Sequence, residues 1–122
     1  MRVEKSALFL KVGVFMFEIN GIEWDIVWVN TRSSDLRRSD GSYTVGMTDW
    51  HRKSVYLAKG LKGAFLRKVM AHELVHCFCF SYDVHIPIQQ EEFMADWVSL
   101  YGEELIYLLD DLMQTIKKAY AM

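Results

Sequence analysis

The period of the hydrophobic pattern changes near residue 64, and this change limits the folds that the chain can adopt. In residues 22–29 every second side chain is large and apolar, from Ile22 to Trp28, as in a β-strand with one buried face. Residues 64–80 and the stretch from Gln90 onward instead follow the period of an α-helix. Strands that precede helices along a chain predict an α+β domain.

Four strands are predicted in the first half, at 7–19, 22–29, 43–48 and 53–58. The pair Asn20-Gly21 separates the first two, and Asn-Gly between apolar runs is a strong signal for a β-hairpin. A small antiparallel or mixed sheet is therefore expected. Residues 1–19 carry no small-residue cleavage site, so they are expected to belong to the fold rather than to a signal peptide.

Two helical regions are predicted in the second half. Residues 64–80 are apolar on nearly all sides, which is typical of a buried central helix. The helix that begins near Gln90 is either split at Gly102 or continues through it. The chain has 122 residues and no linker, so a single domain spanning residues 1–122 is expected.

Composition and charge disfavour several classes of function. The formal net charge is −2 and the basic residues form no block, so no nucleic-acid partner is expected. The apolar N-terminal run is too short to cross a bilayer, and no membrane partner is expected. Cys77 and Cys79 diverge on a helix and cannot easily form a disulfide, which fits a reducing, cytoplasmic location.

The predicted central helix carries the sequence His72-Glu73-x-x-His76. Residues four apart share a helix face, so both imidazoles can bind one metal ion, and neutral imidazole suits zinc. Glu73 is rotated by about 100° from His72, which places it beside the metal, where it can take a proton from a metal-bound water. Because the motif is short, the alternative is a pair of core histidines bonded to backbone or carboxylate groups.

A catalytic zinc usually has a third protein ligand, and two candidates follow the motif. Glu92 and Asp96 share one face of the next helix. There Glu92 can bind the metal while Asp96 accepts the free ring N–H of a ligand histidine. The neighbouring Glu91 is expected to be a solvated acid. The second candidate is His85 in the loop between the helices, although a lone loop histidine is more often a surface residue.

His72-Glu73-x-x-His76 followed by Glu92-x-x-x-Asp96 resembles the paired motifs of the gluzincin metallopeptidases. In size and element order the chain looks most like the compact ImmA/IrrE-type metallopeptidases of phages and mobile elements, and like the minigluzincins. The resemblance implies a zincin-like fold in which a small sheet precedes the active-site helix and C-terminal helices. It also implies one zinc ion per chain, bound by His72, His76 and Glu92, with Glu73 as the general base and Asp96 as the partner of a ligand histidine.

The function implied is that of a zinc-dependent hydrolase in which Glu73 activates a metal-bound water to attack a peptide bond. The partner would be a peptide or protein substrate, such as a regulatory protein of a phage or mobile element. In such folds the strand before the active-site helix, here 53–58, is an edge strand that pairs with an extended peptide. Tyr82 and His85 are candidates for contacts to the oxyanion or the substrate.

Two alternatives remain open at this stage. One is a catalytically silent zincin-fold module that binds a partner or forms part of a phage particle. The other is a compact SprT-like zinc protein in which His85, rather than Glu92, is the third ligand.

Overall fold

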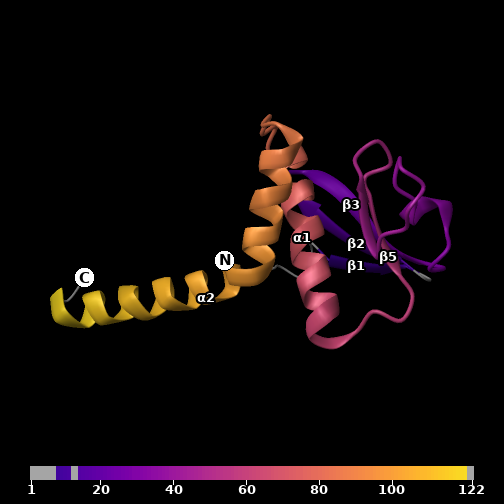
Figure 1. Cartoon of the computed structure of the whole chain (residues 1–122). Coiled ribbons are helices and arrows are strands. Elements are labelled where there is room, and N and C mark those ends of the chain that lie inside the picture. The colour runs from indigo at the N-terminus through magenta and orange to yellow at the C-terminus, as the bar shows by residue number, and fades with distance from the viewer. Residues whose placement is uncertain (1–7, 12–13, 121–122) are drawn as a thin grey trace.

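A computed structural model describes residues 8–11 and 14–120 of the chain. The predicted placement of residues 1–7 and 12–13 within the fold lies outside these described residues. The elements are β1 (Leu8–Lys11), β2 (Val14–Ile19), β3 (Ile22–Val29), the 3-10 turn η2 (Ser34–Leu36), β4 (Gly46–Asp49), β5 (Ser54–Ala58), α1 (Gly63–Ser81) and α2 (Ile88–Tyr120). The strands form one sheet and the helices follow them (Figure 1), so the α+β class is confirmed.

The five strands form a mixed sheet in the order β1-β2-β3-β5-β4. β3 and β5 are parallel, whereas the other neighbouring strands are antiparallel. Asn20 and Gly21 both have positive φ, 51° and 80°, as the type I′ turn of a tight hairpin requires. The apolar run predicted as one strand is in fact two, because Leu8 pairs with Phe17 and the chain reverses between β1 and β2.

The prediction that residues 53–58 form an edge strand is wrong. β5 lies inside the sheet, between β3 and β4, and all five of its residues are buried. The edge strand is β4, which is antiparallel to β5. β5 is covered on both faces: Val55 and Leu57 join one hydrophobic cluster, and Tyr56 joins a second one.

The main hydrophobic core lies between the sheet and α1. It contains Trp24 and Cys77, both with no exposed surface, together with the side chains of β5 that face the helix. The indole N–H of Trp24 donates a hydrogen bond of 2.9 Å to the Ser81 hydroxyl. This bond fixes the C-terminal end of α1 against the β2–β3 hairpin.

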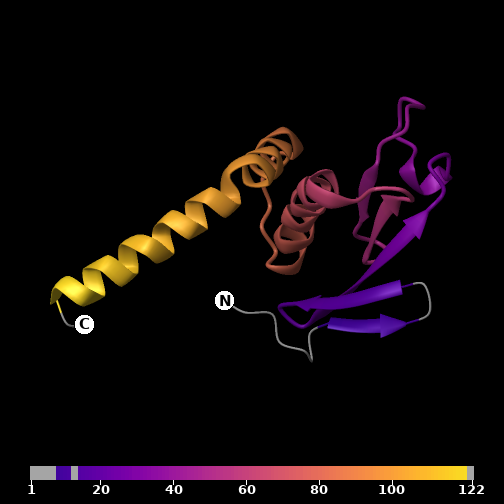
Figure 2. The ribbon, with the colours of Figure 1, turned by 90° about the horizontal axis from the view of Figure 1, so that it is seen from below.

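α1 lies between the sheet and the first part of α2 (Figure 2). It is buried at Glu73, Cys77 and Cys79, but Phe65 and Phe78 are exposed, so the helix is central without being covered on all sides. α2 continues through Gly102 and is not split. It bends along its length, and its second part extends away from the rest of the chain (Figure 1). Neither helix in the described part of the chain is apolar over a length that could cross a membrane.

Candidate metal centre

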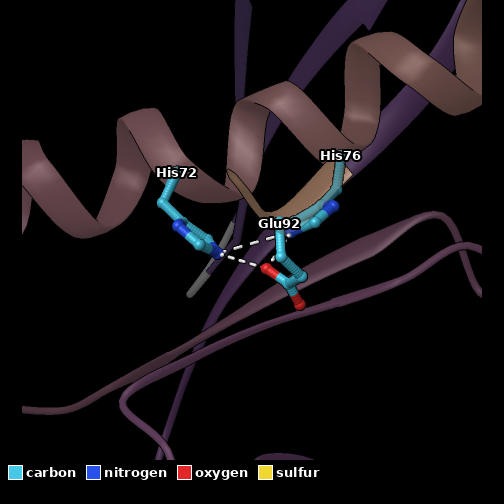
Figure 3. A group of neighbouring side chains, drawn as sticks. All are labelled: His72, His76 and Glu92. Atoms are coloured by element: carbon cyan, nitrogen blue, oxygen red, sulfur yellow. Dashed lines mark hydrogen bonds and ion pairs between the residues drawn. The ribbon is translucent and has the colours of Figure 1, made fainter. Parts of the chain in front are cut away.

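Three side chains from the two helices converge on one point (Figure 3). His72 and His76 lie one turn apart on α1, and Glu92 extends toward them from the first turns of α2. Glu92 Oε1 is 3.0 Å from His72 Nε2 and 3.2 Å from His76 Nε2. The two Nε2 atoms are 3.4 Å apart. The structure therefore brings together the three predicted ligands, and this group could hold a metal ion.

The spacing of these three atoms matches the geometry of zinc coordination. Nitrogen and oxygen ligands at about 2.0–2.2 Å from zinc, in tetrahedral directions, lie about 3.3–3.6 Å from one another. The distances from Glu92 Oε1 to the two ring nitrogens are 3.0 and 3.2 Å, so they require only a small outward movement. A zinc ion held by three protein ligands would keep a fourth position for a substrate or a water, as in catalytic zinc sites.

A carboxylate lies beside the outer ring nitrogen of each histidine. His72 Nδ1 is 2.9 Å from Asp96 Oδ1, and His76 Nδ1 is 2.5 Å from Glu91 Oε2. A carboxylate at Nδ1 favours the tautomer that is protonated there and leaves a lone pair on Nε2. Two such lone pairs and a Glu92 oxygen then face one another, and a cation between them would remove their repulsion.

Without a metal ion, a proton on a histidine could also remove the repulsion between these atoms. Burial disfavours the charged form of His76, but the hydrogen bond to Glu91 and the negative charges of Glu92 and Glu73 outweigh burial and raise the pKa of His76. The structural alternative is therefore a pair of core histidines held by carboxylates, in which the raised pKa of His76 favours its protonated form. The two possibilities differ in metal content, which is directly measurable.

The contact of Glu91 with His76 corrects the expectation that Glu91 is a solvated acid. Its side chain is only 17% exposed. That expectation assumed that only the face shared by Glu92 and Asp96 points toward the histidines. In the structure Glu91, in the first turn of α2, also points toward α1 and contacts His76. The only feature of the sequence that could have indicated a role for Glu91 is its position next to Glu92 in the first turn of the helix.

Glu73 is buried next to this cluster, with 6% of its surface exposed. The Thr48 hydroxyl donates a hydrogen bond of 2.8 Å to Glu73 Oε1. Burial raises the pKa of Glu73, while the Thr48 hydrogen bond and the nearby His72 and His76 oppose that rise. The carboxylate is thus held in a fixed orientation within electrostatic reach of both candidate ligands.

The edge strand β4 passes very close to the Glu73 carboxylate. A Cβ added at Gly46 would lie 2.7 Å from Val69 Cγ1 and 3.2 Å from Glu73 Oε2. A glycine inside a strand often marks such a close approach. Neither Gly46 nor Thr48 was identified from the sequence, although the glycine within the segment 43–48 was an available signal.

An open cleft of about 1140 Å³ contains the candidate centre. Its walls come from β4, the C-terminal half of α1, the loop between the helices and the start of α2. Trp50 and Phe80 line it and stack on each other, with ring centroids 5.5 Å apart. The cleft thus combines a carboxylate-rich centre with an aromatic wall.

The remaining candidates are placed differently. His85 lines the cleft, but its Nε2 is 2.6 Å from Asp83 Oδ1 and it is not part of the converging group. Tyr82 is not among the residues that line the cleft, and it stacks on Phe78 instead. Cys79 lines the cleft beside Glu91, and burial together with that carboxylate raises the pKa of its thiol.

Comparison of the chain with protein-family models, with curated proteins and with solved structures gave no match. Its function is therefore inferred from the geometry of the site.

Proposed function

We propose that this chain is a zinc-dependent peptidase of gluzincin type, with His72, His76 and Glu92 as the zinc ligands and Glu73 as the general base. The observation that carries the proposal is the convergence of the three ligand atoms within 3.4 Å of one another. Two imidazoles and one carboxylate are a ligand set of catalytic rather than structural zinc sites.

The same ligand types also occur in non-haem iron(II) oxygenases. Glu73 favours hydrolysis over that alternative. A buried carboxylate, held by Thr48 and adjacent to the ligands, is positioned to accept a proton. Oxygen activation at iron needs no such base, whereas hydrolysis of a peptide bond needs one.

When bound, zinc would supply Lewis-acid chemistry, polarising a carbonyl group and making water acidic enough to lose a proton near neutral pH. Glu73 accepts the proton from the attacking water and returns it to the leaving amine. Thr48 keeps the Glu73 carboxylate in place during both transfers. Asp96 and Glu91 hold the two imidazoles in the orientation that presents Nε2 to the cleft.

The arrangement around the cleft supports an extended peptide as the substrate. β4 is the edge of the sheet and pairs only with β5 among the described strands, so its other edge is open to strand addition. A peptide bound there would pass Gly46 and Thr48, which are next to Glu73. The stacked pair of Trp50 and Phe80 would favour a large apolar side chain near the scissile bond.

The variant Glu73→Gln tests the proposed mechanism. It removes the base but keeps a side chain of the same size that can still accept the Thr48 hydrogen bond. We expect Glu73→Gln to bind zinc like the parent and to lose peptide cleavage by at least about 100-fold, as removal of a general base does. Cleavage of a diverse peptide library, followed by mass spectrometry, provides the assay.

Glu18→Gln is a matched control, since Glu18 is an exposed acid on β2 that does not line the cleft and is separated from β4 by two strands. It should cleave like the parent. Equal cleavage by Glu73→Gln and the parent would refute the role of Glu73. A parent that binds zinc but cleaves no member of the library would instead favour the catalytically silent zincin-fold module.

A further inference from the structure

The second half of α2 presents an apolar surface that nothing in the described part of the chain covers. All residues from 103 to 120 are exposed. Nine of them are large and apolar, with exposed fractions between 38% and 76%: Leu105, Ile106, Tyr107, Leu108, Leu109, Leu112, Met113, Ile116 and Tyr120. A contiguous apolar surface of this size on a soluble domain usually marks an interaction site.

The sequence of this segment repeats every seven residues. Charged pairs stand at 103–104, 110–111 and 117–118, always at the same two positions of the repeat. Between them, Leu105, Leu109, Leu112 and Ile116 follow one another at spacings of four, three and four. Such spacing places these four side chains in one stripe, which is the seam of a helix that pairs with another helix.

Among the described residues, the segment contacts the domain only at its beginning. Arg67 of α1 forms an ion pair of 2.6 Å with Glu103, and beyond this point the helix extends away from the sheet and α1 (Figure 2). An anionic membrane is a poor partner, because the polar face carries four acids and only two lysines. A protein helix with its own apolar stripe is the better match.

We propose that the partner is a second copy of this chain, and that residues 103–120 of the two copies pair antiparallel. The distribution of charge favours this direction. The four acids, at 103–104 and 110–111, precede the lysines Lys117 and Lys118. Antiparallel pairing brings the basic end of each helix level with the acidic start of the other and leaves like charges level only at 110–111, whereas parallel pairing leaves like charges level at all three charged pairs. Antiparallel helix dipoles add to this preference.

The stripe itself sets the register. Leu105 of one copy meets Ile116 of the other, Leu109 meets Leu112, and the two-fold axis passes between residues 110 and 111. In this register Lys117 and Lys118 are level with Glu104 and Glu103 of the second copy. Each contact occurs twice, as a two-fold interface requires.

The size of the surface and its position both allow such a dimer. Eight of the nine side chains, all but Tyr107, lie on the side of the stripe, and at about half exposure they offer on the order of 700 Å² per partner, which is within the range of a standard interface. The paired segment is about 27 Å long, so the two domains lie toward its opposite ends.

The oligomeric state tests the proposal first. Light scattering coupled to size exclusion of the full chain, over a dilution series, should give twice the 14.3 kDa of one chain. Leu112→Glu places a carboxylate in each copy of the seam and should weaken the dimer by roughly 100-fold or more. Gln114→Glu adds the same charge outside the stripe and should leave the dimer intact. A parent that is monomeric at every concentration overturns the proposal.

Cross-linking tests the direction of pairing without relying on a destabilised variant. Leu105→Cys and Ile116→Cys are made separately, since the native Cys77 and Cys79 are buried. Mixed and oxidised, the two variants should form a covalent heterodimer. Each variant alone should not, because its thiols would be about 16 Å apart in the antiparallel register. Efficient cross-linking of each variant with itself would show parallel pairing and contradict the proposed dimer.

Discussion

Replacing the two carboxylates that contact the outer ring nitrogens should lower zinc affinity to different degrees. Glu91→Gln and Asp96→Asn each keep a hydrogen-bond acceptor and remove only the charge. Loss of such a partner of a ligand histidine typically lowers metal affinity 10–100-fold. The two carboxylates differ in exposure, so the structure predicts which variant suffers more.

Glu91 is 17% exposed and lies 2.5 Å from His76 Nδ1, whereas Asp96 is 69% exposed and lies 2.9 Å from His72 Nδ1. A buried, short, charge-assisted contact contributes more than one screened by water. We therefore expect a loss of about 100-fold for Glu91→Gln and about 10-fold or less for Asp96→Asn.

Competition with a fluorescent chelator of known affinity measures both losses on the same scale. Glu18→Gln, at an exposed position of β2 outside the cleft, is the control and should bind zinc like the parent. Wild-type affinity in Glu91→Gln, or a larger loss in Asp96→Asn than in Glu91→Gln, would show that burial does not set the contribution of these carboxylates.

Three further outcomes follow from the structure. Gly46→Ala should lower the free energy of unfolding by about 1–3 kcal/mol in urea titrations, because its Cβ would lie 2.7 Å from Val69 Cγ1; unchanged stability would mean that β4 can move away from α1. His85→Ala should bind zinc like the parent, since His85 pairs with Asp83, and a clear loss of affinity would instead support His85 as a ligand. The Cys77 thiol should resist alkylation in the native protein at pH 8, because burial raises its pKa to about 12 and leaves it protonated well above neutral pH; rapid labelling without unfolding would contradict this burial.

The local features of the fold could be predicted from the sequence because they depend on local periodicity. Alternation at Ile22–Val29 and the Asn20-Gly21 turn determine a hairpin within a few residues of the chain. The i, i+4 spacing likewise predicts that His72 and His76 lie together, and that Glu92 and Asp96 share a face. The structure adds the packing of α1 against α2, which brings these two faces together.

The features that the sequence did not predict depend on contacts between distant segments. The position of β5 inside the sheet follows from its parallel pairing with β3, and no residue of the segment 53–58 encodes that pairing alone. The burial of Glu91 depends on where the first turn of α2 crosses α1. The bond from Thr48 to Glu73 spans 25 residues and requires β4 at the sheet edge above the helix.

The metal content of the purified chain tests the central proposal most directly. Elemental mass spectrometry of the parent, after addition of zinc and removal of the excess, should give about one zinc per chain. Glu92→Ala, which removes one of the three converging atoms, should lose most of it while keeping the helical circular dichroism of the parent. No bound zinc in the parent would mean that His72 and His76 are a structural pair held by carboxylates, and iron in place of zinc would assign the site to a different chemistry.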